Sequence, residues 1–121
     1  MKTVLLIYHS QSGNTAKLAD AVAQGVSAVD NVTLRKRMAF EANIDDIIDV
    51  DGVIFGSPEN LGYMSGALKD FFDRTFYPAQ PYQLNLPYAL FISAGNDGSG
   101  AVREIDPVSY THLTLPTSPK V

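Results

Sequence analysis

A short polar run near the amino terminus carries the residue types best suited to chemistry. It follows an apolar run and reads, in order, His9, Ser10, Gln11, Ser12, Gly13, Asn14 and Thr15. Gly13 can adopt a positive φ, which lets consecutive backbone N–H groups converge, and the neighbouring hydroxyls can donate further hydrogen bonds. A helix that starts here would add the positive end of its dipole. The run therefore predicts a cradle for an anion, and a phosphate monoester fits such a site.

The same run disfavours some phosphate ligands and leaves one alternative open. It contains no arginine, and the nearest cation is Lys17, so binding would depend on neutral donors. It matches neither the G-x-x-x-x-G-K-S/T phosphate loop nor the G-x-G-x-x-G dinucleotide fingerprint, which disfavours a magnesium nucleotide triphosphate. A polar turn between a strand and a helix, with Ser12 or Asn14 as the N-cap, explains the same residues without a ligand.

Apolar runs and helical periodicity predict the elements that position this run. Continuous apolar runs are typical of buried parallel strands, and apolar residues at three- and four-residue spacing are typical of helices. We expect strands over residues 4–8, 32–38, 53–55 and 88–92, and helices over residues 14–29, 44–48 and 66–75 and from about residue 101. Strands that alternate with helices indicate an α/β fold with a doubly wound parallel sheet.

Composition bounds the class of protein. The chain has 121 residues and a mass of 13.1 kDa, which fits one domain with one hydrophobic core. Thirteen acidic against nine basic residues give a net charge of −4, which argues against a nucleic-acid or membrane-surface partner. The lack of cysteine excludes disulfides, zinc ribbons, iron–sulfur clusters and a cysteine nucleophile. The first apolar run is too short for a signal peptide or a membrane span, so we expect a cytoplasmic protein.

Three loops are expected to meet at one edge of the sheet. In a doubly wound sheet, ligands bind beyond the carboxyl ends of the strands, near the point where the strand order reverses. The polar run is the first loop at that edge. The second loop covers residues 56–66 and the third covers residues 93–98, after the third and fourth expected strands.

Two motifs at these positions resemble a known family. The run Ser10-x-Ser12-Gly13-Asn14-Thr15 resembles the FMN phosphate loop of the flavodoxin-like fold. The run from Gly56 to Lys69, followed by Phe72-Asp73-Arg74, is similar to the loop and helix start of NAD(P)H-dependent FMN reductases and quinone reductases of that superfamily. The resemblance covers residues 2–105. It implies a flavodoxin-like sheet of order 2-1-3-4, with the usual fifth strand and last helix missing.

The resemblance implies FMN as the cofactor and assigns residues of all three loops to it. For the phosphate it implies Ser10, Gln11, Ser12, Gly13, Asn14 and Thr15. For the isoalloxazine ring it implies Ser57, Pro58, Glu59, Asn60, Leu61 and Gly62. For the pyrimidine edge of the ring it implies Ser93, Ala94, Gly95 and Asn96. No catalytic side chain is implied, because hydride transfer through a flavin needs no obligatory protein acid or base.

The third loop bears on the expected class of flavoprotein. Electron-carrier flavodoxins usually hold the ring between aromatic side chains, whereas no aromatic residue occurs from Ser93 to Ile105. An open ring face suits hydride transfer from a stacked nicotinamide. We therefore expect an FMN-binding oxidoreductase that passes a hydride from NAD(P)H through the flavin to a quinone or another acceptor. The alternatives are a flavodoxin electron-carrier module without its own nicotinamide site, and a flavin-free phosphate-binding domain.

The resemblance also implies partners, and several polar residues outside the three loops have two interpretations. The implied partner is a small-molecule electron acceptor or a redox protein, and related reductases often complete the flavin site with a second subunit, so a homo-oligomer is an open expectation. Arg35, Lys36 and Arg37 fit either the extra phosphate of NADPH or the solvated face of an edge strand. His9 fits either catalysis or a loop cap. An acidic cluster comprises Asp45, Asp46, Asp49 and Asp51. We expect this cluster to be a solvated surface and not a metal site.

The chain changes character after Asp106. Residues 107–121 contain no acidic residue and no evident helical stripe. Val108 to Thr117 can be encoded by GTC TCT TAT ACA CAT CTG ACG CTG CCG ACG, which is similar to the adapter DNA of transposase-based sequencing. We therefore expect residues 1–106 to be a truncated flavodoxin-like FMN-binding domain, and residues 107–121 to be a non-native read-through tail that is unpacked from about Pro107. We also expect an unstable or aggregation-prone chain, because its fourth strand would be an exposed apolar edge.

Overall fold

The chain folds as one parallel sheet with helices on both faces. The computed structural model describes residues 1–11, 13–60, 63–94 and 99–114. The strands are β1 (Lys2–Tyr8), β2 (Val32–Met38), β3 (Gly52–Pro58) and β4 (Tyr88–Ser93). The helices are α1 (Asn14–Ser27), α2 (Ile44–Ile47), α3 (Gly66–Ala79), the 3-10 helix η1 (Gln80–Tyr82) and α4 (Ser99–Thr114). All strand pairs are parallel and their order is β2-β1-β3-β4, which confirms the predicted doubly wound α/β fold.

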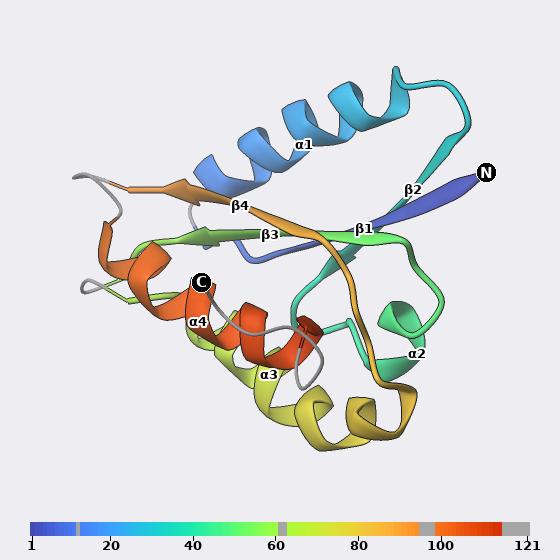
Figure 1. Cartoon of the computed structure of the whole chain (residues 1–121). Helices are drawn as coiled ribbons and strands as arrows, with labels where there is room; N and C mark the ends of the chain where they lie inside the picture. The colour runs from blue at the N-terminus through green and yellow to red at the C-terminus, as the bar shows by residue number, and fades with distance from the viewer. Residues whose placement is uncertain (12, 61–62, 95–98, 115–121) are drawn as a thin grey trace.

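Two layers of helices enclose the sheet (Figure 1). Helix α1 covers one face, whereas α3 and α4 lie together on the other. The main core fills the space between the sheet and α3 with α4. Successive side chains of a strand point to opposite faces, so Leu5 and Ile7 of β1 belong to this core while Leu6 points toward α1. Phe55 of β3 contacts Phe72 of α3 with ring centroids 5.1 Å apart.

The two edge strands differ in charge. Edge strand β2 carries Arg35, Lys36 and Arg37, each of which is paired with an aspartate. Edge strand β4 has the sequence YALFIS, without a charge, and its residues are mostly half-buried. The Phe91 ring of β4 lies against Gly56 of β3, where an added Cβ would lie 2.1 Å from the ring. Within the described residues, β4 is thus the expected apolar edge, and close packing with β3 requires glycine at position 56.

Helix α4 corrects the expectation of an unpacked segment after residue 106. The helix continues through Pro107 to Thr114. Its buried stripe recurs every fourth residue and crosses the boundary at residue 106, which explains the packing. The stripe comprises Ala101, Ile105, Ser109 and Leu113, all fully buried. The expectation was therefore wrong for residues 107–114, and residues 115–121 lie outside the described chain.

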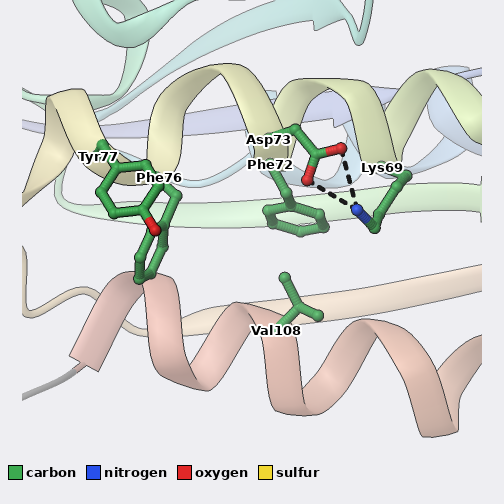
Figure 2. Close-up of a pocket in the computed structure, with 6 residues that line it drawn as sticks. All are labelled: Lys69, Phe72, Asp73, Phe76, Tyr77 and Val108. Atoms are coloured by element: carbon green, nitrogen blue, oxygen red, sulfur yellow. Dashed lines mark hydrogen bonds and ion pairs between the residues drawn. The ribbon is translucent and has the colours of Figure 1, made fainter.

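Packing between α3 and α4 is nevertheless imperfect. Pro107 stands inside the helix, where it has no backbone N–H to donate. The buried Ser109 Oγ has no hydrogen-bond partner in the described structure. A pocket of about 260 Å³ separates Val108 from α3 (Figure 2), and its other lining residues are Lys69, Phe72, Asp73, Phe76 and Tyr77. Residues 107–114 thus bury Ser109 and Leu113 but leave a pocket beside Val108.

Candidate functional site

The carboxyl ends of β1, β3 and β4 meet at one edge of the sheet. Tyr8 of β1 pairs with Gly56 of β3, and Pro58 of β3 pairs with Ser93 of β4. The three predicted loops leave the sheet from these positions. The structure therefore brings together the starting points of all three loops, as the sequence predicted.

The first loop ends in a helix start with free backbone donors. Gly13 is the N-cap of α1 and has a φ of 96°, so the predicted positive φ is confirmed. Its own N–H donates to Ser10 Oγ at 3.1 Å, which closes the loop. The N–H groups of Asn14, Thr15 and the next residue have no acceptor within the helix, because the first turn lacks preceding carbonyls. No side-chain cap is present at this N-cap.

In the other described α-helices, side-chain oxygen atoms of the chain itself accept N–H groups of the first turn. Helix α2 has a capping box made by Asn43 and Asp46. The Ser65 side chain caps α3 by accepting the Leu68 N–H at 3.1 Å. Helix α4 receives the Glu59 carboxylate at Ala101. Among the described residues, α1 is thus the α-helix whose first-turn N–H groups have no side-chain acceptor.

The remaining predicted phosphate residues differ in exposure. Gln11 and Asn14 are exposed, whereas Thr15 is buried within the first turn of α1. Lys17 is exposed one turn along the helix. Ser12 lies outside the described residues. The described donors around the first loop are therefore uncharged apart from Lys17.

The second loop is held from within by a serine pair. Ser57 and Ser65 are both fully buried. The Ser57 hydroxyl donates to Pro58 O at 2.7 Å and accepts the Ser65 N–H at 2.9 Å. Asn60 and Tyr63 exchange two backbone hydrogen bonds of 2.8 and 2.9 Å. The Ser57 side chain therefore supports the loop, and the predicted ring contacts Leu61 and Gly62 lie outside the described residues.

The third loop is joined to the second by Glu59. The Glu59 N–H donates to Ser93 O at 2.9 Å, and Glu59 Oε2 accepts the Ala101 N–H at 3.0 Å. Ala94 is exposed. The predicted contacts Gly95 and Asn96 lie outside the described residues. The Glu59 carboxylate thus faces helix α4.

His9 and the basic cluster of β2 both have partners outside the three loops. The His9 ring contacts Phe40, with centroids 5.9 Å apart and the rings nearly perpendicular. Phe40 follows β2 and is 66% exposed, and the sequence analysis overlooked it although it occupies the same edge of the sheet. The basic cluster of β2 is neutralised, because Arg35 pairs with Asp49 at 2.8 Å and the other two cations also have aspartate partners.

Metal clusters and membrane-spanning helices are two further kinds of feature, considered within the described chain. No group of three or more histidine, aspartate or glutamate side chains there could hold a metal ion. The described helices include none with the length and apolar character needed to cross a bilayer.

Comparisons with known proteins converge on flavin-binding proteins. A family model described as NADPH-dependent FMN reductase matches residues 1–113. A flavodoxin of Aquifex aeolicus (strain VF5) is 40% identical over 73 residues, which cover 60% of this chain and 40% of that protein. An NAD(P)H dehydrogenase (quinone) of Archaeoglobus fulgidus is 34% identical over 99 residues, which cover 62% of this chain and 52% of that protein. The chain thus spans about half the length of these curated relatives, or less.

Solved structures support the fold. An apo NADH:FMN oxidoreductase superposes with a TM-score of 0.79 at 19% identity, over 93% of this chain and 70% of that one. A flavodoxin from the domain Archaea superposes with a TM-score of 0.79 at 22% identity, over 97% of this chain and 79% of that one. At these identities the likeness shows the flavodoxin-like fold alone.

Proposed function

Because the chain belongs to the family of NADPH-dependent FMN reductases, we propose that its three loops bind FMN in an NAD(P)H-dependent oxidoreductase. The observation that carries the proposal is the open first turn of α1. Its backbone N–H groups lack a side-chain cap, and the loop before it is preshaped by Gly13 and Ser10. A phosphate monoester supplies the acceptor oxygens and negative charge that such a helix start favours.

The other two loops would flank the flavin ring. The second loop is fixed by the buried Ser57 hydroxyl, and Glu59 bonds it to the third loop. Hydrogen bonds that already hold Ser57, Glu59 and Ser93 would lower the ordering cost of binding a flat ring beside them. When bound, FMN would supply a ring that takes up a hydride from NAD(P)H and passes electrons to a quinone or similar acceptor. This chain contributes binding and orientation, and no side chain is assigned to proton transfer.

A charged side chain at the first residue of α1 tests the proposed phosphate site. Asn14→Asp adds a negative charge to the exposed first residue of α1. The charge should stabilise the ligand-free chain by about 0.3–1 kcal/mol through the helix dipole. It should also repel the phosphate and weaken FMN binding by at least about tenfold. Fluorescence titration of FMN and urea unfolding measure the two effects.

The opposite signs of the two effects make this test selective. Asn85→Asp makes the same charge change at an exposed position before β4, at the other end of the strands, and is the matched control. Unchanged FMN affinity in Asn14→Asp would contradict a phosphate site at α1. Failure of the unaltered chain to bind FMN would contradict the proposed cofactor.

A second candidate is a flavodoxin-type electron carrier. It is favoured by the 40% identity to the flavodoxin of Aquifex aeolicus (strain VF5). Stopped-flow mixing of the FMN-loaded chain with NADH or NADPH separates the two candidates. A reductase bleaches the flavin absorbance with the nicotinamide alone, whereas a carrier bleaches only after a partner reductase is added.

A further inference from the structure

Glu59 is bonded to both ends of the third loop. Its backbone N–H donates to Ser93 O, at the end of β4, at 2.9 Å. Its side-chain Oε2 accepts the N–H of Ala101, in the first turn of α4, at 3.0 Å. Residues 94–98 connect these two points. One residue of the second loop therefore defines where the third loop leaves the sheet and where it joins the helix.

The Glu59 carboxylate accepts a hydrogen bond from the first turn of α4. Ala101 is the third residue of the helix, so its N–H has no acceptor within the helix. Ala101 is also fully buried, so water does not offer a ready substitute. A carboxylate suits this position because the start of a helix carries partial positive charge and the hydrogen bond is charge-assisted. The reach of the glutamate side chain thus sets the spacing between α4 and the second loop.

We propose that Glu59 is a positioning residue for the flavin ring, an inference that rests on the proposed function. The ring would lie between the second and third loops, and Glu59 is the residue that bonds one to the other. Its carboxylate is engaged by Ala101, so it acts through the spacing of the loops and not by touching the ring. The sequence analysis assigned Glu59 to the ring directly, whereas the hydrogen bonds give it this indirect role.

Two variants of similar size separate reach from charge. Glu59→Gln keeps an acceptor oxygen at the same reach but removes the charge. Glu59→Asp keeps the charge but withdraws it by one methylene. We expect the Glu59→Gln variant to bind FMN within about twofold of the unaltered chain, and the Glu59→Asp variant to bind FMN at least tenfold more weakly. Glu41→Gln and Glu41→Asp make the same changes at an exposed residue and should leave FMN affinity unchanged.

Four measurements distinguish positioning from a general loss of stability. Fluorescence titration gives FMN affinity, and visible circular dichroism of bound FMN reports the ring environment, which should change in Glu59→Asp and recover in Glu59→Gln. Inorganic phosphate, which lacks a ring, should compete with FMN equally well in both variants. Hydrogen exchange of the Ala101 amide in the ligand-free chain tests the hydrogen bond between Ala101 and residue 59. This exchange should be slow in Glu59→Gln and fast in Glu59→Asp.

The outcomes separate this inference from the proposed function. Equal FMN affinity in the unaltered chain and Glu59→Asp overturns the inference alone. Glu59→Gln as weak as Glu59→Asp also overturns it, because charge and not reach would then matter. If the unaltered chain does not bind FMN, the proposed function fails and this inference fails with it.

Discussion

Removal of the Ser57 hydroxyl should destabilise the chain even when no ligand is bound. Ser57→Ala leaves the Ser65 N–H buried without its acceptor, which now lies 2.9 Å away. An unsatisfied buried donor costs about 1–3 kcal/mol. The half-buried Pro58 carbonyl also loses a donor at 2.7 Å but is open enough for water to replace it. We therefore expect a loss of about 2 kcal/mol in the free energy of unfolding.

Urea unfolding of the ligand-free chain measures this loss. A change of about 2 kcal/mol lowers the midpoint by about 1 M if the m-value is near 2 kcal/mol/M. Ser27→Ala, at the exposed end of α1, is the matched control and should stay within about 0.5 kcal/mol. If Ser57→Ala leaves ligand-free stability unchanged but weakens FMN binding, the hydroxyl contacts the ligand and the reasoning is refuted.

Three further changes test the packing of the sheet and of α4. Gly56→Ala should destabilise the chain by about 1–3 kcal/mol, because its Cβ would meet the Phe91 ring, and Phe91→Ala should restore part of this loss in a double-mutant cycle. Burial and a hydrogen bond to Asp106 raise the pKa of Tyr88, so the unfolded chain loses this proton first and stability should fall as the pH rises above about 10. Urea midpoints from pH 8 to 11 should fall less steeply in Tyr88→Phe. Pro107→Ala should raise the free energy of unfolding by up to about 3 kcal/mol, because alanine favours a helix interior and proline does not. An unchanged urea midpoint would contradict this cost of Pro107.

Local patterns predicted the elements and their order well. The apolar runs around Leu5 and Phe55 marked the central strands, because burial on both faces leaves no polar residue in the run. Helix α1 was predicted over residues 14–29 and is observed over Asn14–Ser27. The carboxyl edge of the sheet also followed from topology alone, since parallel strands end on the same side. The loop starts of the candidate site were therefore predictable.

Tertiary contacts were the part that local patterns could not supply. The Glu59 side chain meets an N–H group 42 residues away, and no spacing within its loop indicates that partner. The Ser57 hydroxyl was assigned to a ligand because buried and exposed serines look alike in a sequence. The pairing of Arg35 with Asp49 likewise depends on how α2 lies beside β2. The contacts of these three side chains therefore come from packing, whereas their expected roles toward a ligand stay predictions.

The buried stripe of α4 was missed because the expected domain boundary at residue 106 divides it. Two of its buried positions precede residue 106 and two follow it, so neither half reads as a stripe by itself. The proline, the unpartnered Ser109 hydroxyl and the pocket beside Val108 are irregular features at the start of the segment proposed to be a read-through tail, whereas the family match extends to residue 113. Replacement of this segment is the change most expected to improve packing on that side of the sheet.

The contrast between the edge strands limits how copies of the chain can self-associate. Lys36 and its two arginine neighbours make β2 a poor template for strand addition, because charged side chains on an edge strand disfavour pairing with another chain. Uncharged β4 offers no such barrier. If β4 is the receptive edge among the described strands, strand addition joins two copies and then stops, so we expect dimers in preference to fibrils.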